Sequence, residues 1–79
     1  MPKTIVEKEI VKLTVIKRQF MKISQGKIAE YLNVTRGYIG QIEMEDSNSM
    51  YSFDQLNKLA ILLKCSPKDF MPEMPIAEQ

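Results

Sequence analysis

The stretch SQGKIAEYLNVTRGYIGQIE, residues 24–43, decides the fold because it predicts two short helices joined by a tight turn. Ser24 is a preferred helix N-cap, and apolar residues follow it at helical spacing. Asn33 stands where the first helix must end, since asparagine tolerates the left-handed conformation common after a helix C-terminus. Thr35 can cap the second helix. The inward-facing residues of the pair are Ile28, Ala29, Leu32, Ile39 and Ile42.

The turn between these two helices sets further requirements. Two helices that cross steeply over a three- or four-residue turn bring their backbones close together, so the first helix needs a small residue on its inner side. Ala29 meets that need, and Val34 fills the inside of the elbow. Gly37 and Gly40 are costly in a helix, at up to about 1 kcal/mol each relative to alanine. The segment therefore predicts a helix-turn-helix whose second helix carries two glycines.

A longer helix is predicted before this unit, up to residue 20. Apolar residues recur there at steps of three and four, at Val6, Ile10, Leu13, Ile16 and Phe20. Many residues of the segment are β-branched, and such side chains lose rotamer freedom in a helix. Residues 1–7 are therefore open to a second interpretation as an extended arm.

Two more helices are predicted after the unit. Ser52 and Gln55 match a capping box, and Ser66, Pro67 and Asp69 announce a short fifth helix. The inward-facing residues of the fourth helix are Phe53, Leu56, Leu59, Ala60 and Leu63. The prediction is a compact all-α domain of five helices over residues 1–71, followed by a proline-containing tail over residues 72–79.

Composition narrows the class of protein. A chain of 79 residues is long enough for one small domain. It has no histidine and a single cysteine, Cys65, so it cannot build a His/Cys metal cluster or a histidine-activated nucleophile. No pattern predicts a cofactor or a small-molecule substrate. No apolar run approaches the ~20 residues of a membrane span, and no N-terminal signal region is present. We expect a non-enzymatic protein of the cytoplasm.

Charge is distributed unevenly along the chain, although its net value is only +1. Residues 1–27 carry seven basic and two acidic residues, a local balance of +5, whereas residues 28–50 carry one arginine and four acids, a balance of −3. An uneven distribution of this kind can orient a small domain toward phosphates. A lysine-rich, solvated helix face is the alternative interpretation.

The central stretch resembles the helix-turn-helix of the lambda-type phage repressor family, also called Cro/CI or XRE-like. The segment TRGYIGQIE is close to that family's recognition-helix pattern, and FDQLNKLAILLKCSPKDF is similar to its fourth helix and following short helix. The resemblance extends roughly from Arg18 to Phe70. It implies a sequence-specific DNA-binding transcriptional regulator, a repressor, that places helix 35–43 in the major groove of double-stranded DNA as a homodimer.

The resemblance also implies roles for individual residues. The DNA-facing positions of the family correspond to Ser24, Gln25, Thr35, Arg36, Gly37, Tyr38 and Gln41. Gln25 would lie against a phosphate, or it is only a first-turn residue. Arg36 would bind guanine or hold a phosphate, and Gln41 would read a base edge. Thr35 would act as a cap and a phosphate contact, or as a cap alone. Tyr38 would face the DNA backbone or be a partly buried aromatic.

Other matched positions concern stability, and some depart from the pattern. Arg18 and Glu43 match an internal salt bridge in several phage repressors, and an exposed phosphate contact is the alternative for Arg18. Met44, Glu45 and Asp46 replace a basic run, so this loop must bend away from DNA or weaken binding. Lys22 replaces a usual glycine, which predicts a different turn.

Two interpretations remain for the glycines and for the function. Gly37 and Gly40 are either neutral on an exposed face, or they permit close backbone approach to DNA and shift specificity toward DNA shape. The alternative function is a protein-interaction module, such as an antitoxin or adaptor, that uses the same fold to bind a partner protein. The acidic residues 43–46, the aliphatic N-terminal segment and the methionine-bearing tail favour that alternative.

Overall fold

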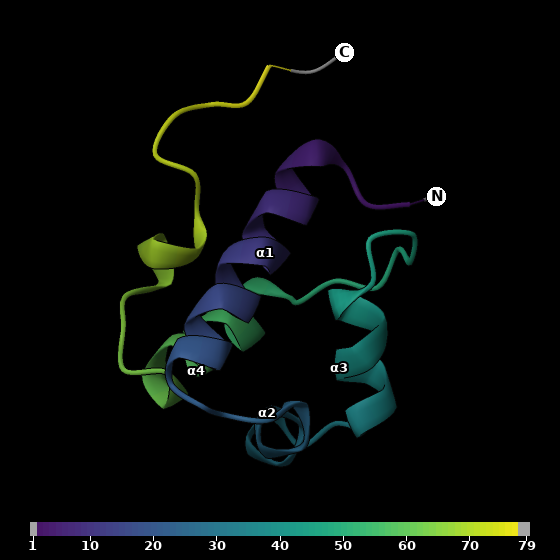
Figure 1. The fold of residues 1–79 in the computed structure, drawn as a ribbon, viewed down its shortest axis with the longest axis vertical. Helices are drawn as coiled ribbons and strands as arrows, with labels where there is room; N and C mark the ends of the chain where they lie inside the picture. The colour runs from purple at the N-terminus through teal and green to yellow at the C-terminus, as the bar shows by residue number, and fades with distance from the viewer. Residues whose placement is uncertain (1, 78–79) are drawn as a thin grey trace.

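The computed structural model describes residues 2–77 and shows an all-helical chain (Figure 1). Its elements are α1 (Ile5–Phe20), α2 (Gln25–Leu32), α3 (Arg36–Glu43), α4 (Phe53–Leu62) and the single-turn 3-10 helix η1 (Pro67–Phe70). The predicted all-α class is confirmed. The prediction of five helices is corrected, because the described residues contain four α-helices and one 3-10 turn. The turn is short because the backbone of Met71 is already extended and Pro72 follows.

The interpretation of residues 1–7 as an extended arm is corrected for residues 5–7, because helix α1 begins at Ile5. Thr4 is its N-cap: the threonine Oγ1 accepts from the Glu7 backbone N–H at 3.1 Å, and the Glu7 carboxylate accepts from the Thr4 N–H at 2.8 Å. This reciprocal capping box offsets the low helix propensity of the β-branched residues that follow. Ile5–Glu7 are therefore helical.

The buried side of α1 differs from the predicted one. Ile16 and Phe20 are 53% and 76% exposed, whereas Val11 and Thr14 are buried. Residues 10, 11 and 14 share one side of the helix, and residues 16 and 20 point away from it because successive residues are about 100° apart. Thr14 is tolerated in the core because its hydroxyl donates to the Val11 carbonyl oxygen at 2.7 Å.

The core lies where α2, α3 and α4 meet the inner side of α1 and η1. Its most deeply buried large side chains come from four elements and the residue after α4: Ile28, Ile39, Ile42, Leu59, Leu63 and Phe70. Phe53 is a further correction, because it is 89% exposed rather than inward-facing. It is the first residue of α4 and lies at the edge of the apolar arc formed by Leu56, Leu59 and Ala60.

The turns after α1, α2 and α4 share one backbone feature. Lys22, Asn33 and Lys64 have φ of 58°, 59° and 56°, and each follows the end of an α-helix. The residue after each donates its N–H to a carbonyl five residues earlier, as in Ile23 to Arg18 and Val34 to Ala29, both at 3.0 Å. The expectation that Lys22 changes its turn is wrong, since Lys22 itself adopts the left-handed conformation that glycine would provide.

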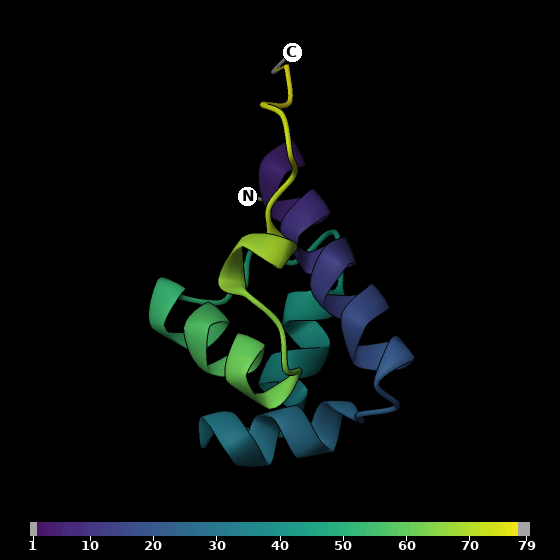
Figure 2. The ribbon, with the colours of Figure 1, turned by 90° about the vertical axis from the view of Figure 1, so that its left-hand side faces the viewer.

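The elements pack around one another without layers. The helices α2 and α3 contact each other at a steep angle, and α1 contacts α3 (Figure 1). Seen from the side, α1 and α4 lie on opposite sides of η1, which contacts both, while α2 crosses beneath them (Figure 2). Within residues 2–77 no helix is long and apolar enough to cross a bilayer.

Candidate nucleic-acid interface

The elbow between α2 and α3 is built from local interactions. Asn33 takes the left-handed conformation, with φ 59° and ψ 46°, and directs the chain out of α2. The Val34 N–H donates back to the Ala29 carbonyl at 3.0 Å, and Ala29 is buried, with 4% of its surface exposed. Ser24 and Thr35 cap the two helices by accepting from the N–H groups of Lys27 and Tyr38, at 3.0 and 3.1 Å. The predicted caps and turn are confirmed.

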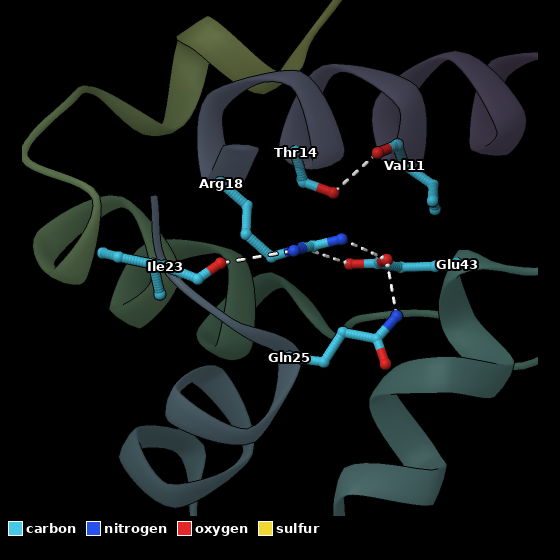
Figure 3. A network of polar contacts seen from close by, with 6 residues as sticks. All are labelled: Val11, Thr14, Arg18, Ile23, Gln25 and Glu43. Carbon is cyan, nitrogen blue, oxygen red and sulfur yellow. Dashed lines mark hydrogen bonds and ion pairs between the residues drawn. The ribbon is translucent and has the colours of Figure 1, made fainter. Parts of the chain in front are cut away.

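A polar network joins the C-terminal ends of α1 and α3 to the N-terminal end of α2 (Figure 3). The Arg18 guanidinium donates twice to the Glu43 carboxylate, Nε to Oε2 and Nη2 to Oε1, both at 2.9 Å. Arg18 Nη1 also donates to the Ile23 carbonyl at 3.2 Å. The two side chains are only 14% and 10% exposed, so the structure places Arg18 inside the protein rather than at an exposed phosphate-binding position.

Gln25 is the third member of this network. Its Nε2 donates to Glu43 Oε1 at 2.8 Å, so the amide nitrogen is used within the protein (Figure 3). Its Oε1 lies near Gly40, 3.8 Å from where a Cβ on that glycine would be. Neither role considered from the sequence, phosphate contact or first-turn filler, anticipated this bond. Gln25 thereby attaches the first turn of α2 to the last turn of α3.

The outer face of α3 is polar and exposed. Ile39 and Ile42 are fully buried on the inner face, which leaves Arg36, Gly37 and Gln41 exposed on the outer face. An alanine Cβ at Gly37 would meet nothing within 4 Å. No internal packing therefore explains the glycine at this position. The face is about two turns long and presents two long polar side chains.

Tyr38 and Gln41 are partly held by the loop that follows α3. The Tyr38 hydroxyl donates to the Met50 carbonyl at 3.0 Å, and the residue is half-buried. The structure thus places Tyr38 as a partly buried aromatic, one of the two interpretations from the sequence. Ser49 Oγ donates to Gln41 Oε1 at 3.3 Å, which leaves the Gln41 amide nitrogen free to donate to a ligand.

Two cationic side chains, Arg36 and Lys27, lie beside the N-terminus of α2. The Arg36 side chain runs next to Gly26, since its Cδ would lie 3.8 Å from a Cβ placed there. Lys27 is exposed in the first turn and lies 3.5 Å from the Glu30 carboxylate. The first N–H groups of a helix have no acceptor within the helix and attract anions. The arrangement is suited to a phosphate group at this end of α2.

Lys3 has a structural role that the sequence did not reveal. Its ammonium donates to the Met44 and Ser47 carbonyls, both at 2.7 Å, and the residue is 5% exposed. Burial lowers the pKa of Lys3, and the nearby Glu7 and Asp46 carboxylates oppose this effect. Lys3 thus fastens the acidic loop after α3 to the N-terminal segment. The basic charge counted for residues 1–27 overstates what is available to a ligand, because Lys3 and Arg18 are used internally.

The similarity of this chain to known proteins concerns its fold alone. No family model and no curated protein matches the chain. Among solved structures, the hypothetical transcription factor NHTF from Neisseria is similar with a TM-score of 0.71 and 16% identity, over 85% of this chain and 75% of that one. The structure of FeII HppE is similar with a TM-score of 0.72 and 17% identity, over 94% of this chain and 42% of that one. The chain thus shares its fold with a protein described as a hypothetical transcription factor.

Proposed function

We propose that this protein is a sequence-specific DNA-binding transcriptional regulator, a repressor of the lambda-type phage family, that acts in the cytoplasm without a catalytic role. The observation that carries the proposal is the exposed polar face of α3 beside the cationic N-terminus of α2. In this arrangement α3 enters the major groove and the start of α2 meets the phosphate backbone. The fold likeness to the hypothetical transcription factor NHTF is consistent with the proposal.

The proposal assigns different tasks to the exposed groups. Gln41 offers a free amide nitrogen to a base edge, and Arg36 lies where it can bind guanine or a phosphate. Thr35, Ser24 and the backbone N–H groups of the first turn of α2 contact phosphates. Gly37 allows the groove wall to approach the helix backbone. Because so few side chains read bases, part of the specificity comes from DNA shape.

A homodimer on a two-fold operator completes the proposal. One α3 with two long polar side chains contacts too few base pairs to select a site in a genome. Two copies related by a two-fold axis place their recognition helices in successive major grooves, about one helical turn apart. We therefore expect the preferred DNA to be a near-palindrome.

The experiment is a selection of bound duplexes from a random library, followed by fluorescence anisotropy at several salt concentrations. Wild-type protein should show an affinity that falls steeply with salt because bound phosphates release counterions. Gln41→Ala should lower the preference for the selected sequence, with an unchanged salt slope, by about 1–3 kcal/mol. Arg36→Ala should do the same if it reads a base, and should flatten the salt slope if it holds a phosphate.

Lys58→Ala is the matched control, since Lys58 is an exposed cation on α4, outside α2 and α3. The DNA affinity of this variant, and the dependence of that affinity on salt, should equal those of the wild type. The absence of salt-sensitive binding at low ionic strength would contradict the proposal.

A specific groove supports the alternative function as a protein-interaction module. It measures about 180 Å3 and lies between α1 and the loop after α3, lined among others by Lys8, Lys12, Val15, Ile16 and Met44. Ile16 and Met44 are about half exposed beside it. An antitoxin or adaptor would use this groove to hold a partner protein. Ile16→Asp should then abolish capture of that partner while leaving any DNA affinity intact.

A further inference from the structure

Gln41, on the outer face of α3, is bonded to Ser49 in the loop that follows the helix. The Ser49 hydroxyl donates to Gln41 Oε1 at 3.3 Å, a long hydrogen bond between residues eight positions apart. Gln41 is exposed, whereas Ser49 is half-buried. The bond therefore engages the amide oxygen of a solvent-facing side chain and leaves its amide nitrogen for a ligand.

The position of Ser49 is fixed by hydrogen bonds on both sides of it. Its own N–H donates to Ser47 Oγ at 3.2 Å, and the Ser47 carbonyl accepts from the buried Lys3 ammonium at 2.7 Å. On the other side, the Met50 carbonyl accepts from the Tyr38 hydroxyl at 3.0 Å. Since the loop is tied both to the N-terminal segment and to α3, the Ser49 hydroxyl is held beside Gln41 before any ligand binds.

The chemistry of the amide determines which base such a glutamine can read. A carboxamide carries its acceptor oxygen and its donor nitrogen on opposite arms of one planar group. Adenine is read with both arms, because its N6 amino group donates and its N7 accepts. Guanine presents two acceptors, O6 and N7, which the N–H groups of the amide nitrogen satisfy alone. When Ser49 holds Gln41 Oε1, the arm directed away from Ser49 is Nε2.

We propose that Ser49 is a positioning residue for base recognition: it makes Gln41 a hydrogen-bond donor that selects guanine over adenine at one position of the DNA site. The choice of base rests on the proposed function, because it requires that α3 binds in the major groove. The bond between Ser49 and Gln41 is measured without DNA.

The first experiment is proton–nitrogen correlation NMR of the side-chain amides in the free protein. Ser49→Ala should move the Gln41 amide resonances, whereas those of Gln19, which is exposed on α1, should stay in place. Asn48→Ala is the matched control, because Asn48 is the exposed neighbour of Ser49 in the same loop. It should leave the Gln41 resonances unchanged. Circular dichroism of each variant establishes that the helices are retained. Unchanged Gln41 resonances in Ser49→Ala would overturn the proposal.

The second experiment compares duplexes with guanine or adenine at the position where Gln41→Ala abolishes the base preference. Wild-type protein should bind the guanine duplex about fivefold or more tightly than the adenine duplex. In Ser49→Ala the amide is free to turn and read adenine with both arms, so this ratio should fall to about one or below. Ser49→Thr keeps the hydroxyl and should keep the wild-type ratio, as should Asn48→Ala.

The ratio of the two affinities separates positioning from a general loss of structure. A variant that is merely less well folded binds both duplexes more weakly and keeps the wild-type ratio. In the Gln41→Ala background, Ser49→Ala should not change the ratio further, because the side chain that it positions is gone. A wild type that prefers adenine, a Ser49→Ala variant with the wild-type ratio, or a Gln41→Ala variant that changes the preference at no position would overturn the proposal.

The two proposals fail in different ways. The absence of salt-sensitive DNA binding would contradict the proposed function and the choice of base with it, while the NMR spectra would still decide whether Ser49 holds Gln41. A wild type that binds DNA with a salt-sensitive affinity and prefers adenine at the Gln41 position would contradict only the role of Ser49.

Discussion

Arg18 and Glu43 form two parallel hydrogen bonds of 2.9 Å although 25 residues separate them in sequence. The pair joins the last turn of α1 to the last residue of α3, and Gln25 adds the first turn of α2 through the same carboxylate. The orientation of α3 thus depends on one Glu43 carboxylate that accepts three hydrogen bonds. This network holds the exposed face of α3 at a defined angle to the start of α2.

Removing one member of the pair should strongly destabilise the fold. Glu43→Ala leaves the mostly buried Arg18 guanidinium without its counter-ion, and we expect a loss of about 3 kcal/mol of unfolding free energy. The measurement is urea denaturation at pH 7. The double variant Arg18→Met, Glu43→Ala should recover part of this loss, since it leaves no unpaired charge. Equal stability of Glu43→Ala and wild type would contradict this prediction.

Tyr51→Phe should remove an alkaline loss of stability. The Tyr51 hydroxyl is buried and has no hydrogen-bond partner among residues 2–77. Burial, reinforced by the Glu43 charge, raises the pKa of Tyr51 above its ordinary value of 10.0. The unfolded chain therefore releases this proton first, and stability contributed by neutral Tyr51 is present below pH 10 and lost as the pH rises above it.

The measurement for Tyr51 is the free energy of unfolding between pH 8 and pH 11, for the wild type and for Tyr51→Phe. The difference between the two should grow in favour of the variant above about pH 10. At neutral pH the variant should be as stable as the wild type or slightly more stable, because it removes an unsatisfied hydroxyl. A clear loss of stability at pH 7 would show that the hydroxyl has a partner.

Gly37→Ala should make the protein more stable and, at the same time, weaken its binding to DNA. The new Cβ enters open space, so the variant should gain about 0.5–1 kcal/mol of unfolding free energy from helix propensity. If DNA approaches the α3 backbone here, its affinity should fall. Thermal denaturation and anisotropy on the same samples measure both effects. Unchanged affinity would mean that Gly37 is neutral on an exposed face.

Lys22→Gly and Lys64→Gly should each stabilise the protein by about 0.5–1 kcal/mol. Both lysines hold a left-handed backbone, which costs a residue with a Cβ more than it costs glycine. Lys12→Gly is the control, because Lys12 is also exposed but lies inside α1. That variant should lose about 1 kcal/mol, as measured by denaturant unfolding. Stabilisation by all three would contradict the conformational explanation.

Lys3→Met should loosen the acidic loop after α3. The methionine keeps most of the apolar stem but leaves the Met44 and Ser47 carbonyls without their charged donor. We expect a loss of about 2 kcal/mol of unfolding free energy. Amide hydrogen exchange should accelerate in residues 44–50 more than in α2. Uniform acceleration throughout the chain would contradict a role confined to this loop.

Local features of the fold could be predicted from the sequence because they depend on neighbouring residues. Ser24, Thr35 and Ser52 cap helices through bonds to residues three positions later, and Asn33 turns the chain with its own backbone. The inward face of the helix-turn-helix was also predictable. Its core residues, such as Ile39 and Ile42, have the spacing of one helix side.

Only the tertiary structure decided which side chains are covered by a neighbouring segment. Periodicity treated Ile16, Phe20 and Phe53 as core, but burial depends on which neighbour covers a helix, and none covers these three. The partners of Lys3, Gln25 and Tyr38 lie 41, 18 and 12 residues away, so no local pattern announces them. The sequence by itself determined the elbow and its caps. Packing of distant segments determined how α3 is held and which of its side chains are left for a ligand.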